Sequence, residues 1–160
     1  MIAQGTCLLA LDENNGGRLV GFVLAGAQFP EDVEQHRIGA EKMDQNTWGN
    51  TSRMLSKIER EANIFERFGV SKVLYSHITS VATSMRGRGL GSRLAATLMD
   101  VGRSKGFPAM VAYCTSFYSA RQKEALGMQC VHSLAYADYK DAEGRPIFTP
   151  FAPHTMASTM

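Results

Sequence analysis

The sequence has few cysteines and no long apolar run. The three cysteines, Cys7, Cys114 and Cys130, are scattered and form no CxxC motif or cluster with histidine. We therefore expect no metal site, and we expect free thiols in a reducing compartment, the cytoplasm. No stretch of about 18 apolar residues occurs, so we expect no membrane-spanning helix. The first ten residues lack the basic and apolar regions of a secretory signal.

A strong charge of either sign is also absent. Lys plus Arg number 17 and Asp plus Glu 15, a net charge of +2. This balance argues against a protein that works through a strong positive field on nucleic acid or an anionic membrane. With 44% hydrophobic and 20% charged residues, the 160-residue chain suits a packed globular domain. No internal repeat divides it, so we expect a single domain over residues 1–160.

The hydrophobic pattern predicts a mixed α/β chain in the order ββ-α-α-β-α-β-α-β-β, with a partly parallel sheet. The predicted hairpin joins strands at 6–11 and 19–25 through the turn at 12–17. Helices are expected from Pro30 to about Trp48, and from an N-cap among Asn50, Thr51 and Ser52 to a stop at Gly69. The other expected elements are strands at 72–81, 109–114, 129–139 and 146–149, and helices from 90 to about 106 and at 118–126.

A glycine-rich turn, Met85-Arg86-Gly87-Arg88-Gly89-Leu90-Gly91, stands between a predicted strand and a predicted helix. The glycines let several backbone N–H groups point at one spot, and the helix N-terminus adds a partial positive charge there. Arg86 and Arg88 add full charges. The turn therefore predicts an anion site, and a diphosphate is the ligand that fits it best.

Two nucleotide motifs do not fit this turn. No GxxxxGK[ST] string occurs, and the third glycine of GxGxxG is replaced by Ser92 or Leu94. The next predicted strand ends in Tyr113 and Cys114 and not in the acidic residue of a dinucleotide site. A Rossmann enzyme is thus a distant alternative. The two arginines also argue against a glycine turn that binds nothing.

The pattern Arg86-x-x-Gly89-x-Gly91 after a strand resembles the coenzyme A signature of the GNAT acetyltransferases. Three later segments resemble one branch of that family, the insect arylalkylamine N-acetyltransferases, which include dopamine N-acetyltransferase. These segments are CTSFYSAR at 114–121 with LGM at 126–128, YADYK at 136–140, and PFAPH at 150–154, where Phe151 replaces an alanine. The resemblance covers nearly the whole chain.

This resemblance implies a GNAT-like fold and acetyl-CoA-dependent N-acetylation of the primary amine of an arylalkylamine or a similar small amine. It implies that the pantetheine arm runs along the strand end at Val81 and Ala82, with an oxyanion held by backbone N–H near Val81. It also implies that the strand at 110–114 splays away and leaves a gap for the acetyl group. The pyrophosphate would lie on Arg86, Gly87, Arg88, Gly89, Leu90, Gly91 and Ser92.

The leaving thiolate of the implied reaction benefits from a proton donor. The position of the tyrosine that many GNAT members use is occupied here by Lys123, so the resemblance makes Ser119 the candidate donor. Thr115 is a candidate to hydrogen-bond the amine or a water. Helix capping is the plain alternative for both hydroxyls.

His154 lies in a segment that the family places near the amine pocket, and its reference pKa near 6.5 suits proton transfer at neutral pH. The alternative is a surface histidine on a C-terminal tail. Cys114 next to the implied acetyl site invites an acyl-cysteine mechanism, but no paired histidine is evident, and a buried small residue is the better interpretation.

The family normally begins with a strand and one or two helices, which carry a glutamate general base and much of the amine pocket. This chain starts at the hairpin, so we expect that first strand and helix to be missing. The open sheet edge would invite self-association. A second hypothesis is therefore a non-catalytic remnant that binds CoA or a protein partner. The sequence identifies neither the amine nor the general base.

Overall fold

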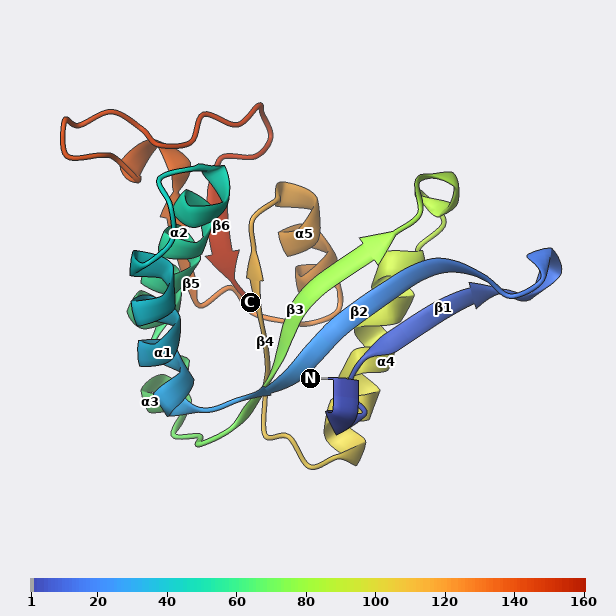
Figure 1. The fold of residues 1–160 in the computed structure, drawn as a ribbon. Helices are drawn as coiled ribbons and strands as arrows, with labels where there is room; N and C mark the ends of the chain where they lie inside the picture. Colours follow the sequence, from blue (N-terminus) through green and yellow to red (C-terminus); the bar gives the residue numbers. More distant parts are fainter. Residues whose placement is uncertain (1) are drawn as a thin grey trace. The chain divides into compact units, whose positions relative to one another are not determined.

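A computed structural model describes residues 2–160 of the chain (Figure 1). The chain divides into two compact units, residues 2–28 with 72–112, and residues 29–71 with 113–160. One strand, β4 (Met110–Cys114), contributes its first three residues to the first unit and its last two to the second.

The first unit is built on a β-hairpin, as the turn-rich sequence predicts. Strands β1 (Leu8–Asp12) and β2 (Arg18–Gln28) are joined through the short 3₁₀ helix η2 (Glu13–Asn15). β2 also pairs antiparallel with β3 (Val73–Val81), which runs parallel to the start of β4. Helix α4 (Leu90–Ser104) packs against β1, β2 and β3 (Figure 1). Their shared core consists of Val23, Ala25, Leu74, Leu94 and Leu98.

The second unit combines helices with a short antiparallel sheet. Helices α1 (Pro30–Glu41) and α2 (Thr47–Ala62) pack against each other, and α3 (Ile64–Phe68) follows. Strand β6 (Met156–Thr159) pairs on one side with the end of β4 and on the other with β5 (His132–Ala135). Helix α5 (Phe117–Ala125) contacts β6. The core on the α2 side is formed by Met54, Ile58, Tyr136 and Ala157.

The helix bounds correct three expectations. The first helix ends at Glu41 and not near Trp48, and the second is capped by Asn46, whose side chain accepts the Gly49 N–H at 2.9 Å. A Cβ at position 49 would lie 2.0 Å from the Asp44 carbonyl oxygen, so glycine allows the close approach that starts α2 early. The helix expected to run to Gly69 is also interrupted, because Asn63 adopts a left-handed conformation (φ 48°) between α2 and α3.

The C-terminal strands of the structure also differ from those predicted from the sequence. The strand expected at 129–139 is β5 alone, and a 3₁₀ helix, η4 (Tyr136–Asp138), follows it. The segment expected to pair back at 146–149 forms only an isolated bridge between Lys140 and Pro146. The strand that pairs with β5 is β6, which the sequence analysis missed because its four residues, Met-Ala-Ser-Thr, carry little strand signal.

By hydrogen bonding, the strand order is β1-β2-β3-β4-β6-β5. The β3–β4 pair is parallel and the other pairs are antiparallel. The prediction of a mixed α/β fold with a partly parallel sheet is therefore confirmed. Within residues 2–160, no helix has the length and apolar character needed to cross a membrane. All three cysteines are free.

Candidate active site

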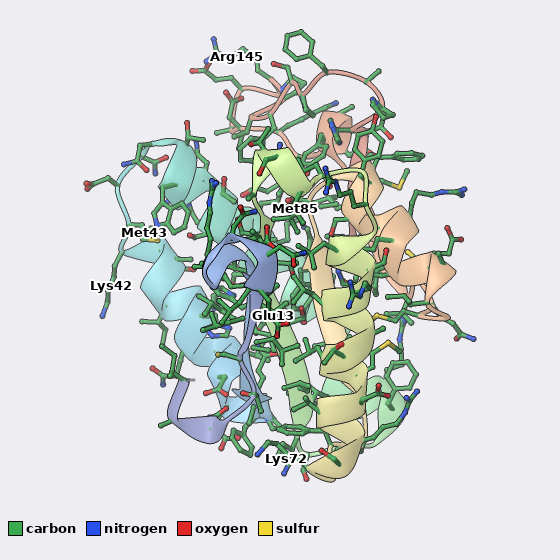
Figure 2. All side chains as sticks on the ribbon, turned by 90° about the vertical axis from the view of Figure 1, so that its right-hand side faces the viewer. Glu13, Lys42, Met43, Lys72, Met85 and Arg145 are labelled. Carbon is green, nitrogen blue, oxygen red and sulfur yellow. The ribbon has the colours of Figure 1, made fainter. Side chains whose placement is uncertain are left out.

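The link between β3 and α4 is a tight turn that depends on two glycines. After Ala82 the chain forms the 3₁₀ helix η3 (Thr83–Met85), and Met85 is labelled at this end of α4 in Figure 2. Gly87 and Gly89 have φ angles of 77° and 75°, which side chains other than glycine rarely adopt. A Cβ at either position would meet nothing within 4 Å. The backbone path therefore requires the glycines, and the space beside them is open.

The N-terminus of α4 has no side-chain cap. Gly89 is the N-cap residue, and the first helical bond runs from the Arg93 N–H to the Gly89 carbonyl at 3.0 Å. The N–H groups of Leu90, Gly91 and Ser92 consequently have no acceptor within the helix. They lie where the helix dipole places its partial positive charge, so the turn presents a cluster of donors to an anion.

Two exposed arginines extend this positive site. In the part of the chain that the structure describes, the side chains of Arg86 and Arg88 form no ion pair and no hydrogen bond. Nothing in this region neutralises their charge, which is available to a bound anion. The predicted diphosphate site thus has three features in one segment, namely open space, N–H donors and cations.

A hollow of about 520 Å³ adjoins the turn within the first unit. Met85, Leu90 and Arg93 line it on one side, and β1 lines it on the other. Arg93 is not among the residues predicted from the sequence. Its place in the first turn of α4, three residues after Leu90, was the available signal.

The end of β3 leaves one strand edge open. β3 pairs with β4 only from Leu74 to Ser76, opposite Met110 to Ala112, although β3 continues to Val81. The Ala82 N–H donates to the Val20 carbonyl at 2.8 Å, so Ala82 and Val20 form a hydrogen-bonded pair. Because N–H groups of successive strand residues point to opposite edges, the Val81 N–H points away from β2. Within residues 2–160, no strand pairs with that edge from Ile78 to Val81.

The other predicted residues, Thr115, Ser119 and His154, lie at the first turn of α5 in the second unit. The helix cap is Ser116, whose Oγ accepts the Ser119 N–H at 3.0 Å. The carbonyl of Thr115 accepts a hydrogen bond from the Tyr136 hydroxyl. Capping, the plain alternative for Thr115 and Ser119, is thus performed by a third residue that the sequence analysis did not select. The sequence signal for Ser116 was a serine at the start of the predicted helix, three residues before Ser119.

His154 is tied to the same turn. Its Nδ1 accepts the Phe117 N–H at 3.1 Å, and its ring meets Tyr118 edge-on at a centroid distance of 5.6 Å. An Nδ1 atom that accepts a hydrogen bond has no hydrogen of its own, so the neutral ring carries its proton on Nε2. In this arrangement His154 offers a donor and not a free basic nitrogen.

The second unit also contains a buried thiol, Cys114 at the end of β4, and a buried lysine, Lys123 in the last turn of α5. Cys114 is 2% exposed, and burial raises the pKa of its thiol, although a hydrogen bond from Ser119 and the charge of Lys123 act in the opposite direction. Lys123 is 3% exposed, and burial lowers the pKa of its ammonium group. A buried, protonated thiol is a poor nucleophile, so this environment gives no support to an acyl-cysteine mechanism.

The remaining histidines have other surroundings. His36 Nδ1 lies 3.0 Å from an oxygen of buried Glu59, and His132 Nε2 lies 3.1 Å from Glu61. His77 meets Tyr75 edge-on on β3. Sequence spacing could not reveal the His36–Glu59 pair, because its members lie on different helices. No group of three or more potential metal ligands occurs within residues 2–160.

Comparison with known proteins identifies the class to which this fold and site belong. The model of the acetyltransferase (GNAT) family matches residues 2–123. Among solved structures, a mosquito arylalkylamine N-acetyltransferase-like 5b is 33% identical, with a TM-score of 0.87, over 99% of this chain and 74% of its own. A Drosophila melanogaster polyamine N-acetyltransferase, described as forming N-acetylagmatine, is 36% identical, with a TM-score of 0.87 and the same coverage of 99% and 74%.

A further neighbour, arylalkylamine N-acetyltransferase 2 from Aedes aegypti, is 25% identical, with a TM-score of 0.88, over 99% of this chain and 74% of its own. The fold is thus that of an acetyltransferase whose neighbours act on amines. The chain belongs to the GNAT acetyltransferase family and is an amine N-acetyltransferase. The resemblance found in the sequence is confirmed.

Proposed function

We propose that this protein transfers the acetyl group of acetyl-CoA to the primary amine of an arylalkylamine or a similar small amine. The observation that carries the proposal is the turn before α4, where uncapped N–H groups, two unpaired arginines and open space coincide. A diphosphate supplies negative charge for the arginines and acceptor oxygens for the uncapped N–H groups.

In the first unit, the pyrophosphate of acetyl-CoA binds from Arg86 to Ser92. The pantetheine arm pairs with the open edge of β3 near Val81 and Ala82. The Val81 N–H, which points to that edge, donates to the oxyanion that forms when the amine attacks the thioester carbonyl. The limited pairing of β3 with β4 supports this role for the edge.

In the second unit, Ser119 gives a proton to the leaving thiolate. This role is supported by the capping bond of Ser116, which uses the backbone N–H of Ser119 and does not engage its hydroxyl. The exposed Thr115 hydroxyl binds the amine or a water. His154 holds the first turn of α5 through Nδ1, and its Nε2–H is the group that donates a hydrogen bond to the substrate.

The amine is proposed to be an arylalkylamine because the α5 turn carries aromatic rings. Phe117 and Tyr118 meet edge-on at 5.6 Å, and both are exposed. Exposed rings offer stacking to an aromatic substrate. The relative that forms N-acetylagmatine makes polyamines the natural comparison in an assay.

The site is tested by changing Gly89 and measuring CoA affinity by titration calorimetry. Gly89→Asp places a carboxylate where the diphosphate would lie, and we expect at least about a tenfold loss of affinity. Gly89→Ala separates backbone strain from charge. Gly16→Asp is the control, because Gly16 has a similar φ of 70° with nothing within 4 Å of its Cβ position but lies in the hairpin turn. Unchanged affinity in Gly89→Asp would refute the proposed site.

A further inference from the structure

A cavity of about 280 Å³ lies between α5 and β6, which contact each other in the second unit. Its walls are mainly apolar and are formed by Phe117, Ala120, Pro153, Met156 and Met160. All of its lining residues belong to the second unit, so the cavity is complete without the first. Small-molecule sites usually measure about 300–1,000 Å³, so this cavity suits a compact ligand.

The side of α5 that borders the cavity is not the side that carries Ser119. The cavity-lining residues of α5 share one side of the helix because they are three and four residues apart, at Phe117, Ala120, Arg121 and Glu124. Ser119 is two residues from Phe117 and one from Ala120, so it projects in another direction. Of the residues assigned above to catalysis and substrate binding, Phe117 is the one that also lines the cavity.

A buried hydroxyl group points into the cavity. Ala157 of β6 packs in the core on the α2 side with Met54, and successive side chains of a strand point to opposite faces. Ser158 therefore faces α5, where it lines the cavity, and it is 5% exposed. Within residues 2–160, its hydroxyl forms no hydrogen bond. A buried hydroxyl without a partner costs free energy, which a ligand that bonds to it would recover.

The other lining residues favour an aromatic ligand without charge. The thioethers of Met156 and Met160 and the ring of Phe117 make favourable contacts with aromatic rings. Arg121 and Glu124, the charged residues of the lining, are exposed and pair with each other at 3.5 Å. Because their charges offset each other, the cavity does not select for an ion of either sign.

We propose that this cavity is a second ligand site, which binds a neutral aromatic molecule of one or two rings through apolar contacts and one hydrogen bond to Ser158. The site is independent of the proposed acetyl transfer, because it uses neither CoA nor the turn before α4. Phenol and toluene are suitable probes, since they have nearly the same shape and differ by a hydroxyl in place of a methyl group.

NMR of the methionine methyl groups in the whole chain measures the binding of either probe. We expect the signals of Met156 and Met160 to shift and saturate as phenol or toluene is added. The signal of Met54, which lies in the core on the α2 side, should stay in place. No shift of Met156 or Met160 up to the solubility limit of toluene would overturn the proposal.

The thiol of Cys130 gives a second measure of occupancy. Cys130 is exposed and lines the cavity, so a bound probe should slow its alkylation by iodoacetamide. Cys7, in the first unit, is the internal reference, and its alkylation rate should not change. Mass spectrometry of the two cysteine peptides follows both rates in one sample. Equal rates for Cys130 with and without saturating probe would contradict binding in this cavity.

Ser158→Ala tests the hydrogen bond. The Ser158 hydroxyl has no partner within the described residues, so the variant should fold. We expect phenol binding to weaken by roughly three- to tenfold and toluene binding to weaken not at all. Ser133→Ala is the matched control, because Ser133 is exposed on the paired strand β5 and does not line the cavity. Unchanged phenol affinity in Ser158→Ala would overturn the proposal.

Ala120→Leu tests the cavity itself. The larger side chain fills part of the volume and removes apolar contact area from a ligand, so both probes should bind about tenfold more weakly or worse. Ala125→Leu is the matched control, since Ala125 is exposed on the same helix and does not line the cavity. Full affinity for both probes in Ala120→Leu would overturn the site. No acetylation is measured in these experiments, so their failure and the failure of the proposed function are distinguishable.

Discussion

Ser116 Oγ accepts the backbone N–H of Ser119 at 3.0 Å, and this bond makes Ser116 the cap of α5. The hydroxyl of Ser119 is therefore not needed to start the helix. We expect Ser119→Ala to lower kcat and kcat/KM together by roughly 10²-fold, because a proton donor acts in the transition state. Steady-state acetylation at saturating amine checks this outcome.

Ser133→Ala, at an exposed position of β5, is the control for Ser119→Ala and should leave the rate unchanged. A raised KM for acetyl-CoA at normal kcat would assign Ser119 to binding. Ser116→Ala should instead lower the free energy of unfolding by about 1 kcal/mol, as the loss of a helix cap does.

Arg86 and Arg88 should contribute to CoA affinity through charge. We expect Arg86→Ala and Arg88→Ala each to weaken CoA binding by roughly three- to tenfold, with the loss diminishing at high salt because exposed charges are screened. Arg103→Ala is the control, since Arg103 lies in the last turn of α4 and is exposed. Equal affinities of the three variants across salt concentrations would contradict the assignment.

The His36–Glu59 pair predicts how stability depends on pH. The hydrogen bond that His36 donates to Glu59 raises the pKa of His36 above its ordinary value of 6.5, although burial opposes this, and the charges of Glu59 and Asp32 add to the increase. The folded chain therefore holds the proton more tightly than the unfolded chain. The stabilisation is complete below the ordinary pKa and is lost as the pH rises through the raised value.

Urea unfolding between about pH 5 and about pH 9 measures this dependence. His36→Gln should remove the decline that His36 causes, and it should also lower the free energy of unfolding at low pH by about 1–3 kcal/mol, because Glu59 is 7% exposed and loses its charged donor. An unchanged slope in His36→Gln would refute the linkage.

Strand β1 should support self-association. β1 is an edge strand of the sheet. Its residues Leu9 and Leu11 are 69% and 54% exposed. An exposed edge without lysine or proline offers its backbone to another strand. We expect sedimentation to show an average mass that rises with concentration, and less so in a Leu9→Lys, Leu11→Lys double variant. A concentration-independent monomer mass for the wild-type chain would contradict this.

Much of the first unit could be predicted from the sequence, because its signals are local. The Asp12–Gly17 turn predicts the hairpin, and the glycines with Leu90, Leu94 and Leu98 predict the turn and α4. These elements occur as expected, and the turn has the open, uncapped geometry that an anion site needs.

The second unit was harder to predict, because its contacts join distant segments. The start of α2 depends on the close approach of Gly49 to Asp44, and β6 is defined by pairing with β4 and β5. The bond from the Phe117 N–H to His154 spans 37 residues and has no local signature. Lys123 has the sequence of an ordinary helix-surface lysine, and only the packing of α5 shows that it is buried.

The most direct test of the account is steady-state acetylation by the purified chain. The wild-type protein is incubated with acetyl-CoA and a panel of arylalkylamines and polyamines, and both released CoA and the N-acetylated amine are measured. We predict equal amounts of both products with at least one arylalkylamine, because each acetyl group transferred to an amine releases one molecule of CoA. Tight CoA binding without acetylation of any amine in the panel would contradict the account and favour a CoA-binding protein without turnover.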